Sequence, residues 1–310
     1  MAAGSRPIFA GRRLYEQIQK EIRELLGEPP GSFSVSLRYG ALPPDKRELL
    51  QQIERDYSEM QEDINRESMG LTLASDREKL RLLEAEKRKD LAGVLSPAEL
   101  LEYDLRASPT AGQLRTPMAM MEATKEEYRA IFPLQQAYDQ QWRPSYWTDS
   151  SDDPGFYRNR QEAGRQLAQR IKEFLGPERG QLYLWAQEPE FGSMYTVANR
   201  LGLPAETPAR VMQLRDSTSS RGVAILDDKT LTNDQRRAMI QGLAQEARSQ
   251  LNALLPAEAQ QQLGARSLRW VSSLDRGSVT TYNSLPGSSS ISVRSVPRAA
   301  PTPPPRPPGG

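Results

Sequence analysis

The residues best suited to chemistry gather between positions 138 and 160. This segment, YDQQWRPSYWTDSSDDPGFYRNR, combines six aromatic side chains with the aspartates Asp149, Asp152 and Asp153. Clustered carboxylates are typical of a calcium loop, but Pro154 stands where that loop needs glycine, and Arg160 where it needs a bidentate glutamate. We therefore expect the aromatic side chains to hold a long inter-helix loop against the core. A ligand platform, or a hydrolase that uses the aspartates with a divalent ion, is the alternative.

Two absences restrict the catalytic chemistry more than any motif does. The sequence has no histidine and no cysteine. These residues supply the machinery of Ser-His-Asp and Cys-His enzymes, the usual zinc ligands, and disulfides. The sequence also lacks a glycine-rich phosphate loop and a dinucleotide fingerprint. We therefore predict a protein that is not an enzyme and that uses no cofactor and no metal.

Five residues are candidates for contact with a partner protein. Met118, Met120 and Met121 stand close together, and methionine is common on adaptable binding surfaces. Trp142 and Trp147 belong to the aromatic segment described above. For the three methionines, a place in the core is the alternative.

The segment 195–216, YTVANRLGLPAETPARVMQLRD, resembles a helix-turn-helix at first. Ala198 and Gly202 fit the small residues of that motif, but Pro208 stands where a recognition helix packs an apolar side chain. The second helix would offer three base-reading side chains: Arg210, Gln213 and Arg215. A nucleic-acid-binding regulator is the alternative function, although we expect no nucleic acid partner.

Apolar residues recur at helical spacing along most of the chain. Residues 45–67, for example, carry apolar side chains at intervals of four, four, three and four, a stripe that predicts an amphipathic helix. We expect helices at 12–26, 45–67, 76–94, 97–106, 109–115, 125–142, 156–175, 177–187, 190–202, 207–216 and 233–255. The apolar run Gly222–Leu226 is expected to lie in a loop, as a short extended piece.

Helix starts and corners also have recognisable sequences. Four segments fit the capping box, in which Ser or Thr and an acidic or amide residue three positions later satisfy the first amides of a helix. They begin at Ser75, Ser96, Thr124 and Thr232. Three corners share a second pattern, in which a long helix closes with leucine, meets proline within two residues and restarts. The closing leucines are Leu95, Leu175 and Leu255. Either an ancient duplication or a common way of turning a corner explains them.

Composition divides the chain into three regions. We expect an N-terminal helical region, 1–150, and a C-terminal helical region, 151–276, which together could be one continuous domain. The stretch WTDSSDDPG interrupts the helical pattern between them. Residues 277–310 are rich in Ser, Thr, Gly and Pro, and this composition predicts a disordered tail.

The sequence also bears on location. No stretch approaches the roughly 18 consecutive apolar residues that a membrane helix needs, so we expect no transmembrane segment. The first residues, MAAGSRPIFAGRR, lack the apolar core of a signal peptide. We expect a periplasmic or secreted protein if a signal peptide was removed upstream of this chain, and a cytoplasmic protein otherwise.

Two resemblances to known families bear on function. The motif Leu231-Thr232-x-x-Gln235, followed by an amphipathic helix, resembles the LTxxQ signature of Spy-like periplasmic chaperones and envelope-stress proteins. A longer series of segments resembles uncharacterised all-helical proteins of Verrucomicrobia-type bacteria: 83–115, 123–139, 197–216 and 231–255. The resemblances imply an all-α fold and an envelope or secreted location. The first also implies the holding of unfolding clients without enzymatic activity, and neither implies particular site residues.

We therefore predict an all-α fold, a multi-helix bundle of amphipathic helices and helix–proline–helix corners with a disordered C-terminal tail. The expected function is that of a non-enzymatic interaction protein of the bacterial cell envelope, chaperone-like or scaffold-like. Its partners would be other proteins, contacted by Met and Leu stripes and steered by arginines. A homodimer is one candidate assembly.

Overall fold

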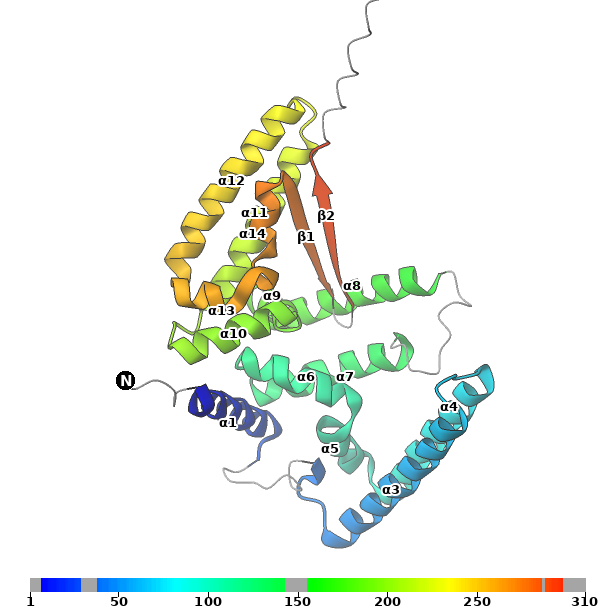
Figure 1. The fold of residues 1–310 in the computed structure, drawn as a ribbon. Helices are drawn as coiled ribbons and strands as arrows, with labels where there is room; N and C mark the ends of the chain where they lie inside the picture. Colours follow the sequence, from blue (N-terminus) through cyan, green and yellow to red (C-terminus); the bar gives the residue numbers. More distant parts are fainter. Residues whose placement is uncertain (1–6, 29–37, 143–154, 286–287, 298–310) are drawn as a thin grey trace, which may run out of the picture. The chain divides into compact units, whose positions relative to one another are not determined.

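The fold is described from a computed structural model over residues 7–28, 38–142, 155–285 and 288–297. These residues form thirteen helices and one two-stranded sheet (Figure 1), which confirms the all-α fold class. The chain divides into two compact units. Unit 1 is residues 1–187 with 285–288, and unit 2 is residues 188–284 with 289–310. The division thus falls after Gln187, not near the expected residue 150.

Unit 1 contains eight helices within the described residues. They are α1 Pro7–Leu26, α3 Pro44–Glu67, α4 Ala74–Val94, α5 Pro97–Ala107, α6 Pro109–Met120, α7 Lys125–Trp142, α8 Phe156–Leu175 and α9 Pro177–Ala186. Helix α6 packs against α1, α5, α7 and α9, and α8 packs against α7 and α9. Helices α3 and α4 form a long hairpin that joins the other helices through α5 (Figure 1).

The core of unit 1 lies around α6 and α7. Leu114 and Met118 of α6, Tyr128 and Phe132 of α7, and Ile171 of α8 are each at most 1% exposed. Burial of a large apolar side chain stabilises a fold by roughly 1.5–3 kcal/mol, so each of these residues contributes to the stability of unit 1. The long hairpin contributes little to this core.

Capping explains where several helices begin. Three of the four expected capping boxes close in both directions: those at Ser96, Thr124 and Thr232. The box expected at Ser75 is wrong. Helix α4 begins at Ala74, and the carboxylate of Asp76 accepts from the amide of Leu73 at 3.0 Å. Asp76 therefore takes the role expected of Glu78, and the N-cap lies at Leu73, two residues before Ser75.

Unit 2 contains five helices and nearly all of both strands. The elements are α10 Pro189–Leu201, α11 Thr207–Asp227, α12 Asn233–Leu254, α13 Ala257–Ser267, α14 Arg269–Asp275, β1 Ser278–Leu285 and β2 Ser288–Ser295. Helix α11 packs against α10 and α12, α12 packs against α14, and α13 packs against α10. The core includes Val211, Met212, Ile240 and Val279, all fully buried. All three expected helix–proline–helix corners are confirmed, at α4–α5, α8–α9 and α12–α13.

Helix α11 differs most from the expectation. It continues past residue 216 to Asp227, so the prediction of an extended piece at Gly222–Leu226 is wrong. The small polar residues that read as a loop form the face on which β1 packs: Thr218, Ser219 and Gly222 are buried. A Cβ atom at Gly222 would lie 2.7 Å from a methyl of Val279, so only glycine admits the strand this closely.

The C-terminal region also differs. Residues 278–285 and 288–295 form the hairpin β1–β2, so the predicted tail does not begin at 277; residues 286–287 and 298–310 lie outside the described residues. Helices α13 and α14 precede the hairpin and were absent from the expected set. The Ser/Thr-rich composition suggests disorder, but threonine and valine also favour β-strands. Val279 and Thr280 of β1 are buried.

The long helices are amphipathic and charged rather than uniformly apolar. Over the described ranges, none has the length and hydropathy to lie across a lipid bilayer.

Candidate functional site

The hairpin of α3 and α4 ends in a tight turn at residues 68–73. The amide of Leu71 donates to the carbonyl of Ser68 at 2.8 Å, and Asp76 fixes the start of α4 as described above. Met69 and Gly70 have φ angles of 43° and 84°, which let the chain reverse direction. Hydrogen bonds and backbone conformation, rather than apolar packing, therefore hold this turn.

Three apolar side chains of the turn face solvent, and we name them the apolar tip: Met69, Leu71 and Leu73. Their exposed fractions are 91%, 71% and 55%. Single exposed apolar residues are ordinary on a protein surface, but clustered ones mark interaction sites. Burying such side chains would stabilise the fold by roughly 1.5–3 kcal/mol each, and the hairpin leaves that energy unused. The apolar tip is therefore available for contact with another molecule.

Besides its exposure, Met69 has an unusual backbone conformation. Its φ lies in the left-handed region, which costs an ordinary side chain about 1–2 kcal/mol and which glycine or asparagine adopts more readily. Gly70, the next residue, follows that preference. A methionine that is both strained and almost fully exposed does not stabilise the turn. We interpret Met69 as a contact residue, since local strain collects at functional positions.

The surroundings of the apolar tip are acidic. Residues 59–79 contain six acidic and three basic side chains. Arg66 pairs with Asp63 at 2.7 Å, whereas the exposed Glu59 and Glu62 have no ion pair within the described part of the chain. The resulting negative field favours basic partners. The arginines expected to steer acidic clients therefore do not dominate this surface.

The other end of the hairpin is fixed by a polar network around Glu54 of α3. Its carboxylate accepts hydrogen bonds from the hydroxyls of Tyr39, at 2.7 Å, and Tyr103, and from Arg38 at 2.8 Å. Burial by itself raises the pKa of Glu54, but these donors outweigh burial and the net pKa is lowered. Burial, followed by the carboxylate of Glu54, raises the pKa of Tyr103. The network keeps Glu54 ionised at neutral pH and ties α3 to α5.

Further contacts hold the hairpin along its length. Arg88 of α4 donates two hydrogen bonds of 2.7 Å to Asp104 of α5, a bidentate pair of the strong type. One helical turn from Glu54, Tyr57 donates to Asp90 at 2.6 Å and joins α3 to α4; this bond raises the pKa of Tyr57 to about 12. An apolar cluster packs beneath the Glu54 network: Tyr39, Leu42, Leu50, Leu91, Leu95 and Tyr103. The hairpin is therefore anchored at its base and exposes apolar side chains at its end.

The methionines expected to contact a partner lie in unit 1, away from the apolar tip in sequence. Met118 and Met121 are 0% and 3% exposed, and Met120 is half-buried. Met118 and Met121 therefore fill the core, which is the alternative that the sequence left open. Neither offers a side chain to a partner in this fold.

The two candidate tryptophans differ in what the structure describes. Trp142 ends α7, and its ring centre lies 5.9 Å from that of Phe156 at the start of α8. This contact joins two helices, as expected for the aromatic segment. Trp147 and the aspartates at 149–153 lie outside the described residues.

The helix-turn-helix-like segment 195–216 buries one of its three candidate base-reading side chains. Arg215 is 1% exposed and its guanidinium pairs with Glu188 and Asp216, so it is unavailable to a base. Arg210 pairs with Glu206 at 3.4 Å. Arg210 and Gln213 are exposed, whereas the opposite face of α11 is buried in the core of unit 2.

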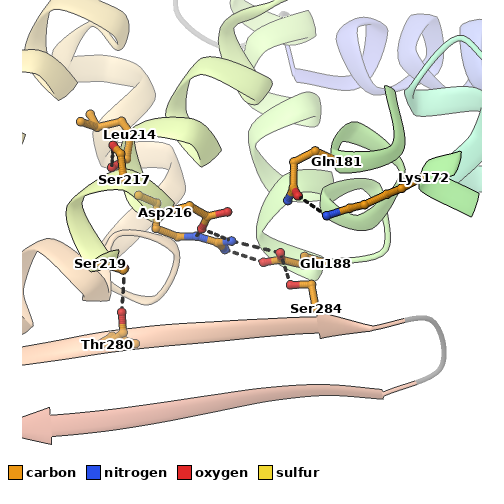
Figure 2. A network of polar contacts seen from close by, with 10 residues as sticks. Lys172, Gln181, Glu188, Leu214, Asp216, Ser217, Ser219, Thr280 and Ser284 are labelled. Atoms are coloured by element: carbon orange, nitrogen blue, oxygen red, sulfur yellow. Dashed lines mark hydrogen bonds and ion pairs between the residues drawn. The ribbon is translucent and has the colours of Figure 1, made fainter. Parts of the chain in front are cut away.

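Glu188 and Arg215 form the most buried charged group of unit 2. Glu188 precedes α10, accepts from Arg215 at 3.0 Å on one oxygen, and also accepts from the hydroxyl of Ser284 on β1 (Figure 2). Each charge has a partner of opposite charge, so the group holds the start of α10, α11 and β1 together.

Across the described residues, no cluster of three or more acidic side chains is arranged to hold a metal ion.

Comparison with known proteins found no match for this chain among family models, curated proteins or solved structures. The two family resemblances noted from the sequence therefore stay predictions. The apolar tip is the functional candidate that periodicity alone misses, because SMGLTL falls between two amphipathic patterns. Its signal is local: three apolar residues occupy a glycine-containing turn, where polar residues are the rule.

Proposed function

We propose that this chain is a non-enzymatic interaction protein of the chaperone or scaffold type, which holds apolar segments of other proteins on the tip of its α3–α4 hairpin. The observation that carries the proposal is the exposure of Met69, Leu71 and Leu73, of which none is less than half exposed. The anchored base supports it, since an anchored hairpin presents its tip in one defined orientation to α5. The resemblance of residues 231–235 to the LTxxQ signature supports the client-holding form and an envelope location.

The chemistry of the tip suits brief and adaptable contacts. Methionine is unbranched and polarisable, so it adjusts to irregular apolar surfaces. Burying three apolar side chains would contribute only several kcal/mol to the binding free energy. The entropy lost on association offsets much of this gain. We therefore propose weak, reversible holding rather than a stable complex. The acidic last turns of α3 would favour client segments that are both apolar and basic.

An aggregation assay tests the proposal. The chain is added to reduced lysozyme, a basic client, and separately to reduced α-lactalbumin, an acidic one, while light scattering is followed. We expect suppression near stoichiometric ratios, stronger for lysozyme at low salt. At about 0.5 M salt the difference between clients should shrink, because charge steering is screened. Unchanged scattering of both clients at a large molar excess of this chain would overturn the proposal.

A further inference from the structure

The hairpin β1–β2 has one covered edge. On the side of β1 away from β2, the hydroxyl of Ser219 in α11 donates to the carbonyl of Thr280 at 2.8 Å (Figure 2). Gly222, on the same helix, lies against Val279. Helix α11 therefore occupies the edge of β1 that would otherwise be open to another strand.

The other edge belongs to β2, and no described segment of the chain pairs with it. The amide of Val296 donates to the carbonyl of Gly277 at 3.0 Å, which sets 295 opposite 278 and 293 opposite 280. Because ladder hydrogen bonds alternate along an antiparallel strand, residues 290, 292 and 294 bond toward β1 and residues 291, 293 and 295 point their amides outward. Within the described residues, nothing bonds to those outward groups.

The side chains of β2 do nothing to protect this edge. Every side chain from 290 to 295 is exposed, and the exposed fractions of Ile291 and Val293 are 45% and 57%. Proteins usually blunt open edges with lysine, proline or bulges. The strand SSSISVRS has no lysine or proline, and its single charge, Arg294, pairs with Asp227 of α11. The edge therefore has the properties of a strand that pairs with another strand.

We propose that the free edge of β2 pairs antiparallel with the β2 strand of a second copy of this chain, giving a symmetric dimer with a continuous four-stranded sheet. An isologous contact requires a self-complementary surface, and β2 has one. With Ser292 opposite Ser292 of the second copy, residues 289–295 all find partners. Ile291 then lies opposite Val293, and Arg294 lies opposite Ser290, so apolar pairs meet and like charges do not. This contact is independent of the apolar tip.

Proline at an outward position tests the pairing selectively. Val293→Pro removes an amide that points away from β1, so the bonds within the hairpin are kept. Val293→Thr keeps the amide and is the matched control. By sedimentation equilibrium, we expect the unchanged chain and Val293→Thr to dimerise and Val293→Pro to be monomeric. A monomeric unchanged chain, as expected if the edge instead receives a peptide from another protein, would overturn the proposal.

Disulfide trapping tests the register without relying on proline. The chain has no cysteine, so one introduced thiol reports on one contact. In the proposed register the Cα atoms of residue 292 in the two copies lie about 4.5 Å apart, within reach of a disulfide. With oxidised glutathione, Ser292→Cys should give a covalent dimer far faster than the control Ser290→Cys. Equal rates for the two variants would contradict the register and the proposal.

Discussion

The guanidinium carbon of Arg215 lies 3.9 Å from the centre of the Tyr282 ring. The buried charge of α11 is therefore shared between an aromatic face on β1 and the carboxylate of Glu188. Burial lowers the pKa of Arg215, but the hydrogen bonds to Glu188 outweigh burial and the net pKa is raised. The buried guanidinium of Arg215 therefore links the hairpin β1–β2 to the helices of unit 2. Because it is shielded from water, its charge is stabilised by protein groups alone.

Removing that charge should be strongly destabilising. Arg215→Met leaves Glu188 buried without its partner, and we expect a loss of about 3–5 kcal/mol in the free energy of unfolding. Replacing both residues, with Glu188→Leu and Arg215→Met, should lose much less than the single variant. The control is Arg221→Met, whose pair with Glu246 is exposed, and it should change stability by about 1 kcal/mol or less. Urea unfolding compares the three variants with the unchanged chain, and a double variant that lost as much stability as Arg215→Met would contradict the coupling.

The close approach of α11 and β1 predicts that Gly222 tolerates no side chain. Gly222→Ala places a Cβ 2.7 Å from a methyl of Val279, so overpacking should destabilise unit 2 by about 1–3 kcal/mol. The matched control is Gly242→Ala in α12, where a Cβ meets nothing within 4 Å. There the change should stabilise by about 0.5–1 kcal/mol, because alanine suits a helix interior better than glycine. Thermal unfolding of the two variants should therefore shift in opposite directions.

The network at the base of the hairpin predicts a pH dependence. The pKa of Glu54 is lower in the folded chain than its ordinary value of 4.5, so the unfolded chain binds the proton more tightly. Its stabilising contribution is therefore present above about pH 4.5 and is lost as the pH falls through the lower folded-state value. Glu54→Gln should lower the free energy of unfolding by about 1–3 kcal/mol at pH 7, and by progressively less toward pH 3.

Urea unfolding from pH 7 to pH 3 measures this convergence. Glu59→Gln, an exposed glutamate on the same helix, is the control and should track the unchanged chain at every pH. A deficit in Glu54→Gln that stayed constant down to pH 3 would show that ionisation of Glu54 does not support the fold.

Strain at the apolar tip predicts that the turn can be improved. Met69→Gly relieves the left-handed conformation, and glycine's extra unfolded-state entropy offsets part of the gain. We expect the free energy of unfolding to rise by up to about 1 kcal/mol. Leu71→Gly, two positions on and without that strain, should instead lose about 0.5–1 kcal/mol. A loss in both variants would remove the evidence that Met69 is strained.

Local sequence signals predict most of the helices well. Helices at 125–142 and 156–175 match the structure residue for residue, because capping residues, first-turn prolines and apolar stripes act within one helix. The same holds for the three corners. The compact units divide after Gln187 rather than near residue 150, because a break in the helical pattern does not show which helices pack together, and α8 packs against α7.

The errors arise where packing between distant segments overrides local composition. Residues 217–222 read as a loop because serine, threonine and glycine favour turns, yet β1, some 60 residues later, packs on them. Met118 looks like a surface candidate by type but lies in the core. The apolar tip is missed because three apolar residues in a turn match no helix or strand pattern, and only the structure shows that they are exposed.

Replacing the three side chains of the apolar tip is the decisive experiment for the proposed client-holding role. Met69→Ser, Leu71→Ser and Leu73→Ser are combined in one variant. A control variant carries the same change at three exposed apolar residues elsewhere: Leu82, Leu101 and Met239. Both are compared with the unchanged chain in suppressing aggregation of reduced lysozyme, after urea unfolding shows that each is folded. We expect the tip variant to lose suppression and the control to keep it; equal suppression by all three proteins would contradict the role of the tip.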